Sequence, residues 1–342
     1  MKKNLLILVC LPAVLFTACN KELSDNFTVY ANHPLNDTIW VRNVPGGAAV
    51  NDCFDALFPD KVLVDSFNAA QGGSLHFGDS ISIEFPANVC TGSGNGGGSG
   101  IFTGNVKVLV IPIRRKGDFI KFFKPTTTRN GSLLETGGGL YIRIFNDDKE
   151  LTLAQGASIK VRFNDVDTPK NNMQAFYGKE TIPLILKGID TGFSWLRDAD
   201  TSWLTVWSKT AVPPATTAYT GYEINARQLR WISAERYVDS SLPKARLTTI
   251  LPPNFTNKNT AVFTVFANQK TVVDMQGDFA SRSFYANNIP LKSMVRLISI
   301  SKIGDDFYLG IENVSSVDAV TIHKITPVKK SVSDILAYLN GL

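Results

Sequence analysis

Residues 80–85 read Ser-Ile-Ser-Ile-Glu-Phe, and this strict alternation of polar and apolar side chains decides the class of fold. Because successive side chains of a β-strand point to opposite faces, the pattern predicts a strand with one buried face. Residues 106–113, Val-Lys-Val-Leu-Val-Ile-Pro-Ile, are more continuously apolar and predict a strand covered on both faces. Alternation returns at 140–145 and 158–163, with Gly, Asn and Asp turns between segments. This arrangement is typical of a β-sandwich or barrel.

The second half of the chain continues the pattern without a fixed-period repeat. Strands are predicted at 261–266, 294–300, 307–311 and 319–325, and turns at 287–290 and 303–306. The last segment predicts a helix, because its apolar residues recur at helical spacing: Val332, Ile335, Leu336 and Leu339. Ser331 or Ser333 can cap the start of that helix. We therefore expect a mainly β fold with two β-sandwich-like domains, at 37–190 and 191–342, the second ending in this short helix.

Two glycine-rich segments predict local structure. Thr136-Gly137-Gly138-Gly139 precedes a predicted strand and indicates turns with positive φ. Residues 92–100 could cradle a phosphate, but no Gly-Lys-Ser/Thr ending and no helical pattern follow. A loop between two strands is the prediction for this second segment.

The N-terminus resembles a bacterial lipoprotein signal. A basic Met1-Lys2-Lys3 precedes an apolar run at 5–16 that is too short to span a bilayer, and Leu15-Phe16-Thr17-Ala18-Cys19 resembles a lipobox. The resemblance implies a signal peptide at 1–18, an acylated Cys19 (diacylglycerol and palmitate-type chains) and a polar, flexible tether at 19–36. The alternative is an ordinary secretory signal that leaves a free N-terminal Cys19. Cys10 has too few apolar residues before it to be the cleavage site.

The residues after Cys19 indicate the compartment. Lys21-Glu22 resembles the export signal of Bacteroidetes-type lipoproteins, which moves them to the outer face of the outer membrane. A lipid-anchored outer-membrane protein at the cell surface is the prediction. The alternatives are a periplasm-facing position and a tether with chance charges.

The composition fits an ordinary globular protein and excludes some partners. Of 342 residues, 44% are hydrophobic and 19% charged, and the formal net charge of +5 falls when Lys2 and Lys3 leave with the signal. So small a charge does not indicate nucleic acid. The densest basic cluster, Arg114-Arg115-Lys116, ends a predicted strand and indicates a solvated turn.

The mature chain would keep the thiols of Cys53 and Cys90. In an oxidising compartment the pair either forms a disulfide or remains two buried free thiols, and the sequence leaves both open. No histidine cluster accompanies these cysteines, so neither a zinc site nor any other metal or cofactor is predicted.

Motifs of catalysis are lacking. Gly-x-Ser-x-Gly and His-Glu-x-x-His do not occur, and the three histidines, His33, His76 and His323, are far apart. Asp165-Val166-Asp167 and Asp198-Ala199-Asp200 could offer oxygens to calcium but do not continue into a calcium loop, so turn-forming acids are the preferred interpretation.

Tryptophans give the main hint of binding. Trp195, Trp203 and Trp207 fall in a polar segment, and exposed indoles suit sugars or partner proteins. The alternative is core packing, in which Trp203 and Trp207, at i and i+4, would share one helix face.

Several segments together resemble uncharacterised Bacteroidetes surface lipoproteins with a ZU5-like β-sandwich. They include 104–108, Lys116-Gly117-Asp118-Phe119-Ile120, Lys124-Pro125-Thr126-Thr127-Thr128, 133–139, 151–153, 231–237 and Leu251-Pro252-Pro253, and the likeness extends from about Gly78 onward. Thr128 stands where a serine is usual. The resemblance implies a fold and a location and supplies no catalytic residue.

We therefore expect a surface lipoprotein that acts as a non-catalytic binding or assembly module, with a glycan or protein partner. The alternative is a glycan-capture accessory protein or a glycan hydrolase whose two acids meet only in the folded chain.

Overall fold

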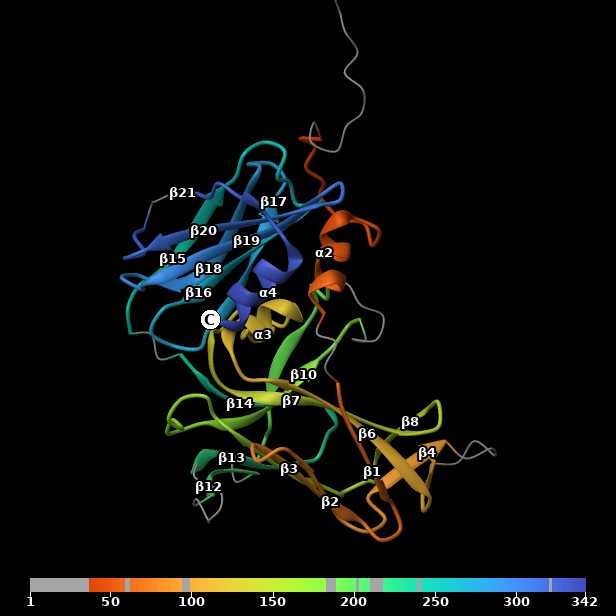
Figure 1. The fold of residues 1–342 in the computed structure, drawn as a ribbon. Coiled ribbons are helices and arrows are strands. Elements are labelled where there is room, and N and C mark those ends of the chain that lie inside the picture. Colours follow the sequence, from red (N-terminus) through yellow and green to blue (C-terminus); the bar gives the residue numbers. More distant parts are fainter. Residues whose placement is uncertain are drawn as a thin grey trace, which may run out of the picture. The chain divides into compact units, whose positions relative to one another are not determined.

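The computed structural model describes residues 37–58, 62–93, 99–182, 189–200, 203–209, 218–238, 241–319 and 322–342 (Figure 1). The predicted signal peptide, Cys19 and the tether lie outside the described residues. Thr38–Leu342 form one compact unit. The described part of this unit consists of three β-sheets and a few short helices, so the predicted mainly β class is confirmed.

The first sheet is centred on β7 (Leu134–Asn146), which pairs with β6 (Asn105–Ile113), β8 (Lys149–Leu153) and β14 (Arg230–Tyr237). Its other described strands are β1 (Leu63–Asn68), β4 (Cys90–Ser93), β5 (Ser99–Ile101), β10 (Gln174–Lys179) and β11 (Ser194–Arg197). The predicted strand at 106–113 is β6. Its Val108 and Val110 enter one core whereas Ile111 and Ile113 enter another on the opposite face, so the strand is covered on both faces.

The second sheet packs on the first. Its described strands, in spatial order, are β12 (Leu204–Lys209), β13 (Tyr219–Ala226), β9 (Ile159–Asn164), β3 (Ile81–Phe85) and β2 (Gly73–Phe77). Ile81, Ile83 and Phe85 are buried in the core shared with the first sheet, as their alternation predicts. The two sheets therefore form a β-sandwich.

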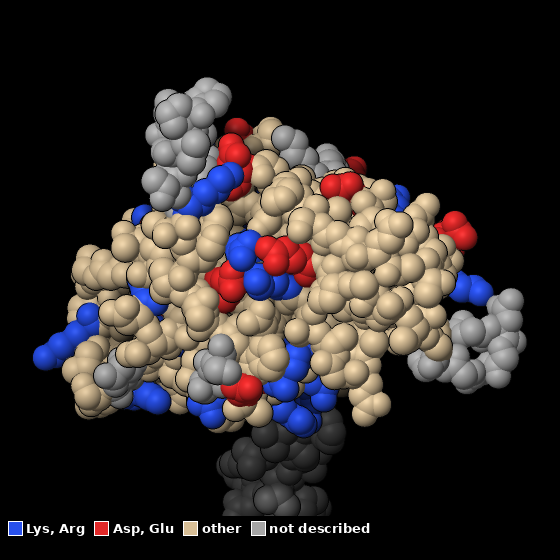
Figure 2. Space-filling model, turned by 90° about the horizontal axis from the view of Figure 1, so that it is seen from below, with Lys and Arg blue, Asp and Glu red and all other residues tan. Residues whose placement is uncertain are grey.

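The outer face of the second sheet has a paired charge cluster. Arg162 on β9 contacts Glu84 on β3 at 2.6 Å and Glu223 on β13 at 2.5 Å, and Lys160 lies 3.4 Å from Glu84. Figure 2 shows mixed basic and acidic side chains in the middle of the molecule's lower face, surrounded by uncharged surface. Because the charges pair across strands, this cluster presents no field of a single sign.

The glycines at 137–139 lie within β7, so the prediction that they form turns before a strand is wrong. Only Gly138 among them has a positive φ, and the register with β14 shifts opposite it, between Ala234 and Glu235. A Cβ at Gly137 would overlap the ring of Tyr222, and one at Gly139 would overlap the carbonyl of Ile232. The glycines are required here for a β-bulge and for close approach.

The third sheet contains the later strands: β21 (Ile322–Lys324), β15 (Lys244–Ile250), β18 (Ser283–Pro290), β17 (Val272–Asp278), β16 (Thr260–Phe266), β19 (Val295–Ile303), β20 (Asp306–Val314) and β22 (Val328–Lys330). Strand β16 is buried along its whole length. Phe263 and Val265 face the helices and the first sheet, whereas Val262 and Phe266 face a core within the third sheet. This two-sided burial explains its continuously apolar sequence.

One predicted turn in this sheet is confirmed and one is wrong. The turn at 303–306 joins β19 to β20, with Gly304 at φ 61°. Residues 287–290 instead belong to β18. Asn288 has a φ of 62°, and the pairing of β18 with β15 shifts register between Ala245 and Leu247. The polar Asn-Asn pair therefore marks an irregular strand and not a chain reversal.

Three helices of the described chain pack with the faces of the first and third sheets in one core: α2 (Ala49–Leu57), α3 (Lys116–Lys121) and α4 (Val332–Asn340) (Figure 1). Helix α4 confirms the predicted C-terminal helix. Ser331 caps it by accepting from the Asp334 N–H at 3.1 Å, and Ile335 and Leu339 are fully buried. Each such side chain contributes about 1.5–3 kcal/mol on burial. We call this shared core, which includes Phe119, Trp231 and Phe263, the interface core.

The predicted domain boundary between residues 190 and 191 falls inside the first sandwich. Strands β11, β12, β13 and β14 follow it in sequence, yet they complete the first two sheets. The chain changes to the third sheet between Tyr237 and Lys244.

No helix in the described segments combines the length and the apolar character that a membrane span requires.

Candidate ligand-binding cleft

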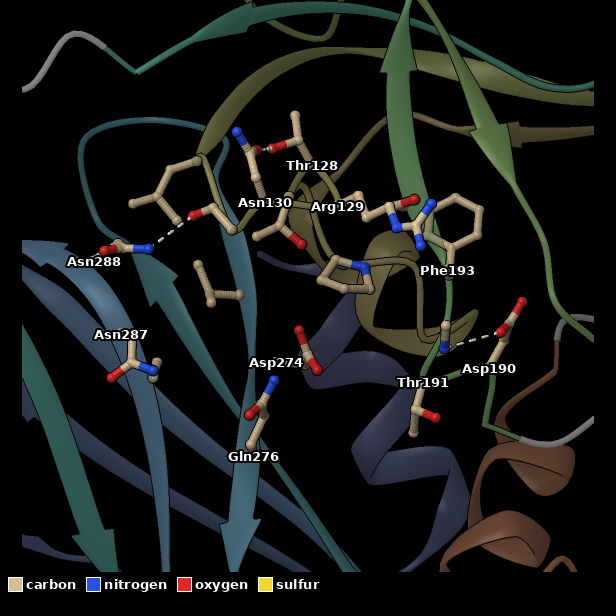
Figure 3. A pocket seen from close by; sticks show the side chains of 18 of the residues that line it. Thr128, Arg129, Asn130, Asp190, Thr191, Phe193, Asp274, Gln276, Asn287 and Asn288 are labelled. Carbon is tan, nitrogen blue, oxygen red and sulfur yellow. Dashed lines mark hydrogen bonds between the residues drawn. The ribbon is translucent and has the colours of Figure 1, made fainter.

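A cleft of about 610 Å³ opens between the first and third sheets (Figure 3). One wall is the loop 123–133 between α3 and β7, and a second consists of the end of β10 with residues 190–194. The third wall comes from β17 and β18. The cleft thus depends on three segments that are remote in sequence.

Strand alternation places the polar side chains of β17 in this cleft. Val273 and Met275 belong to the core of the third sheet, and Val272 belongs to the interface core. Asp274 and Gln276 share the face of Val272 and line the cleft. Figure 3 shows both side chains on the same strand, below the loop of Thr128 and Asn130.

Asp274 is a carboxylate without a cationic partner. Within the described chain, no ion pair and no side-chain hydrogen bond links it to another residue. Desolvation raises its pKa above the ordinary value, and a hydrogen bond from its own backbone N–H opposes that shift only in part. A ligand that donates hydrogen bonds would replace the water that this carboxylate has lost.

Asp190, across the cleft, differs from Asp274 because its carboxylate has many partners within the protein. Its carboxylate accepts from the N–H groups of Thr181 at 2.9 Å, Ile182 at 3.2 Å and Gly192 at 3.2 Å, and also from the hydroxyl of Thr181. Lys124 lies 3.6 Å away. Burial acts to raise the pKa of Asp190, but these hydrogen bonds and Lys124 outweigh it, so the net pKa is lowered. Asp190 is a structural carboxylate with little capacity left for a ligand.

Lys124, which pairs with Asp190, also has all its partners within the protein. Lys124 is only 2% exposed, and its ammonium lies 4.6 Å from the ring centroid of Phe193 and 5.6 Å from that of Trp231. Burial lowers the pKa of Lys124, and Asp190 and Glu180 oppose that effect. The ammonium is therefore held by Asp190 and by two aromatic faces.

The loop 123–133 is fixed in place by local hydrogen bonds. The Thr128 N–H donates to the Ser132 carbonyl at 3.0 Å, and the Ser132 N–H donates to the Thr128 hydroxyl at 3.1 Å. Gly131 takes a φ of 75° at the tip. Asn288 of β18 donates to the Gly131 carbonyl at 3.3 Å, which links the loop to the third sheet. This wall is therefore largely preformed.

Several side-chain amides in the cleft remain able to donate to a ligand, among them those of Asn130 and Gln276. The oxygen of Asn130 accepts from Thr128 and from Ser132 (3.2 Å), and that of Gln276 accepts from Tyr285 at 3.0 Å. No hydrogen bond within the described residues uses the NH₂ group of either amide. The cleft thus offers amide donor groups, those of Asn130 and Gln276 being oriented by their own hydrogen bonds, together with the acceptor Asp274.

The described lining residues include two carboxyl groups, and the two differ in their availability to a ligand. A glycoside hydrolase needs one carboxylic acid and one carboxylate that both reach the substrate. Of the two carboxyl groups that line the described walls, Asp190 is saturated by its own neighbours and only Asp274 is free. Arg129 and Lys179 add exposed positive charge at the rim.

The predicted tryptophans do not line this cleft. Trp195 is fully buried in the interface core, and its indole donates to the Pro125 carbonyl at 3.1 Å, so it supports the loop from behind. Trp203 stacks with Arg227 at 5.0 Å, and Trp207 lies half-buried in β12. The shared helix face considered for Trp203 and Trp207 does not form, because Leu204–Lys209 pairs as a strand with β13.

Cys53 and Cys90 are both buried free thiols, so of the two alternatives the structure has the free thiols and not the disulfide. Cys53 on α2 lies in the interface core and Cys90 on β4 in the core between the first two sheets.

The aspartates considered as calcium ligands are engaged in ion pairs: Asp165 pairs with Lys270, and Asp198 pairs with Arg227. Among the described residues, no group of three His, Cys, Asp or Glu side chains could hold a metal ion.

Sequence reasoning missed Asp274, Gln276 and Asn130. A signal for Asp274 exists, because Val272-Val273-Asp274-Met275 puts one acid into an otherwise apolar strand. No local sequence pattern could show that this face of the strand lies against the loop 123–133.

No protein-family model and no curated protein matches this chain.

Proposed function

We propose that this protein is a lipid-anchored outer-membrane protein, displayed at the cell surface, that binds a glycan in the cleft without cleaving it. The observation that carries the proposal is the unpaired carboxylate of Asp274 in a cleft that is also lined by available amide donors. Sugar hydroxyls both donate and accept, so a carboxylate and amides that line one cleft match them.

A glycan array probed with the detergent-solubilised full chain tests the binding proposal. We expect Asp274→Asn to weaken the best interaction by about tenfold or more, because it removes a charge-assisted hydrogen bond. Asp305→Asn, at an exposed turn, should leave binding unchanged. If Trp207→Ala abolishes binding while Asp274→Asn does not, the binding surface is on the second sheet and the cleft proposal is wrong.

Location is tested separately. The lipobox-like sequence supports acylation of Cys19, and more than one acyl chain gives stable anchoring. Cys19→Ser should move the protein from the membrane to the soluble fraction. Surface display predicts labelling of intact cells by a membrane-impermeant reagent, and protection of the protein until the cells are broken would overturn it.

A further inference from the structure

The basic triplet Arg114-Arg115-Lys116 leads into a second cleft, of about 1070 Å³. Arg115 and Lys116 line it at the start of α3, Asp165 to Lys170 line it after β9, and residues 267–270 line it between β16 and β17. The side chains of the described walls include four cations, Arg115, Lys116, Lys170 and Lys270, and two carboxylates, Asp165 and Asp167.

Both carboxylates are engaged by the same cation. Lys270, which is 5% exposed, pairs with Asp165 and lies 3.4 Å from Asp167. Asp165 also accepts from the hydroxyl of Tyr222 at 3.1 Å. These two acids carry one negative charge more than Lys270 offsets, so the four cationic and two acidic side chains of the described walls leave a net charge of +2.

Lys170 pairs with Glu135, but Arg236 contacts the same carboxyl group at 2.6 Å. Arg115 donates to the Asn340 carbonyl at 2.5 Å, and Lys116 donates to the Phe266 carbonyl at 2.9 Å. Neither Arg115 nor Lys116 forms an ion pair with a described carboxylate. Positive charge therefore exceeds negative charge at this end of the cleft.

The electrostatics of Lys116 agree with that excess. Its pKa is lowered, first by burial and then by Arg296, while Lys170 and Lys270 add to the effect and Asp167 opposes it. An ammonium whose charged neighbours are mostly cations gains when an anion enters.

We propose that Arg115, Lys116 and Lys170 form an oxyanion site that takes a phosphate or sulfate group, either as the free anion or as an ester on a larger ligand. An oxyanion has several acceptor oxygens and matches a guanidinium beside two ammonium groups. The site is separate from Asp274 and does not depend on the proposed function.

Titration calorimetry of the full chain at low salt tests this site with inorganic phosphate, sulfate, glucose 6-phosphate and glucose. We expect phosphate, sulfate and the ester to bind with millimolar affinity that weakens as salt is added, and glucose not to bind here. Strong binding of the ester with weak binding of free phosphate would identify an esterified ligand. Similar affinities would identify the anion itself, and either result supports the site.

Three variants locate the binding. Lys116→Gln should weaken phosphate binding about fivefold or more because it removes the ammonium charge, and Lys324→Gln on exposed β21 should have no effect. Asp167→Asn should tighten phosphate about twofold to threefold, because it removes a repelling charge that is 56% exposed. Absence of phosphate and sulfate binding, or equal affinities in wild type, Lys116→Gln and Asp167→Asn, would overturn the proposal.

Discussion

Thr126 and Val272 join the first and third sheets through a reciprocal pair of hydrogen bonds. The Thr126 N–H donates to the Val272 carbonyl at 2.8 Å, and the Val272 N–H donates to the Thr126 hydroxyl at 2.9 Å. Neighbouring bonds extend this contact, since Thr271 donates to the Leu134 carbonyl at 2.8 Å. The loop that walls the cleft is therefore attached to the strand that carries Asp274.

Thr126→Val should destabilise the protein by about 1–3 kcal/mol, because it leaves the buried Val272 N–H without its acceptor. Thr126 is fully buried, and valine has nearly the same shape. Urea denaturation measures the change. Thr205→Val, on the exposed side of β12, serves as the control and should change stability by less than about 0.5 kcal/mol. An equal effect of the two substitutions would contradict a special role for the Thr126 hydroxyl.

Gly117→Ala should destabilise the contact of α3 with α4. A Cβ at this position would overlap the backbone carbonyl of Leu339, so the two helices would have to separate. We expect a loss of about 1–3 kcal/mol in thermal or urea unfolding. Gly46→Ala is a matched control because nothing lies within 4 Å of its added Cβ. A neutral Gly117→Ala would mean that the helices are not packed this closely.

Glu235 should make stability fall as pH rises. It is fully buried beside Ser233, and desolvation is the main reason that its pKa is raised from 4.5 to about 8, against hydrogen bonds from Ser233 and Thr136. Between these values the folded state holds a proton that the unfolded state releases. The free energy of unfolding therefore decreases with pH in this window, by up to about 1.4 kcal/mol per unit, and levels off above it.

Glu235→Gln keeps the shape of the protonated acid and should remove that decrease. The measurement is urea unfolding at several pH values from 5 to 9 in wild type and variant. A variant whose pH dependence equals that of wild type would show that Glu235 does not titrate in this way.

Cys53 and Cys90 should remain unreactive until the protein unfolds. Burial raises the pKa of Cys53 to about 12 and that of Cys90 to about 11, so little thiolate is present at neutral pH. Mass spectrometry after iodoacetamide treatment should find both cysteines unmodified in the native protein and both alkylated in denaturant. Resistance to alkylation in denaturant without reductant would instead indicate a disulfide.

Much of the β structure could be predicted, because its signal is local. The alternation at 80–85 reports one buried face, and the spacing of Ile335 and Leu339 reports a helix. Helix α2 was missed although its buried residues, Val50, Cys53, Phe54 and Leu57, also have helical spacing. The helix has only nine residues, so its periodic pattern is short.

The domain boundary and the cleft could not be predicted in the same way. Strand β14 returns to pair with β7 across almost a hundred residues, and no local pattern encodes that pairing. Asp274, Asn130 and Asn288 line the same cleft only because the first and third sheets pack together. Tryptophan exposure also depends on tertiary packing, which is why Trp195 belongs to the core. The lipid anchor at Cys19 stays a prediction from sequence.

Under the proposed function, the Asp274 carboxylate binds ligand hydroxyls in the cleft. The most direct test is calorimetric affinity for the best glycan of the array, measured from pH 3.5 to pH 8 in wild type and Asp274→Asn. Because the pKa of Asp274 is raised and its ionised form is the acceptor, wild-type affinity should fall as pH drops through a midpoint above 3.8. The variant should bind weakly at every pH. Equal affinities of the two proteins throughout this range would show that the Asp274 carboxylate does not bind the glycan.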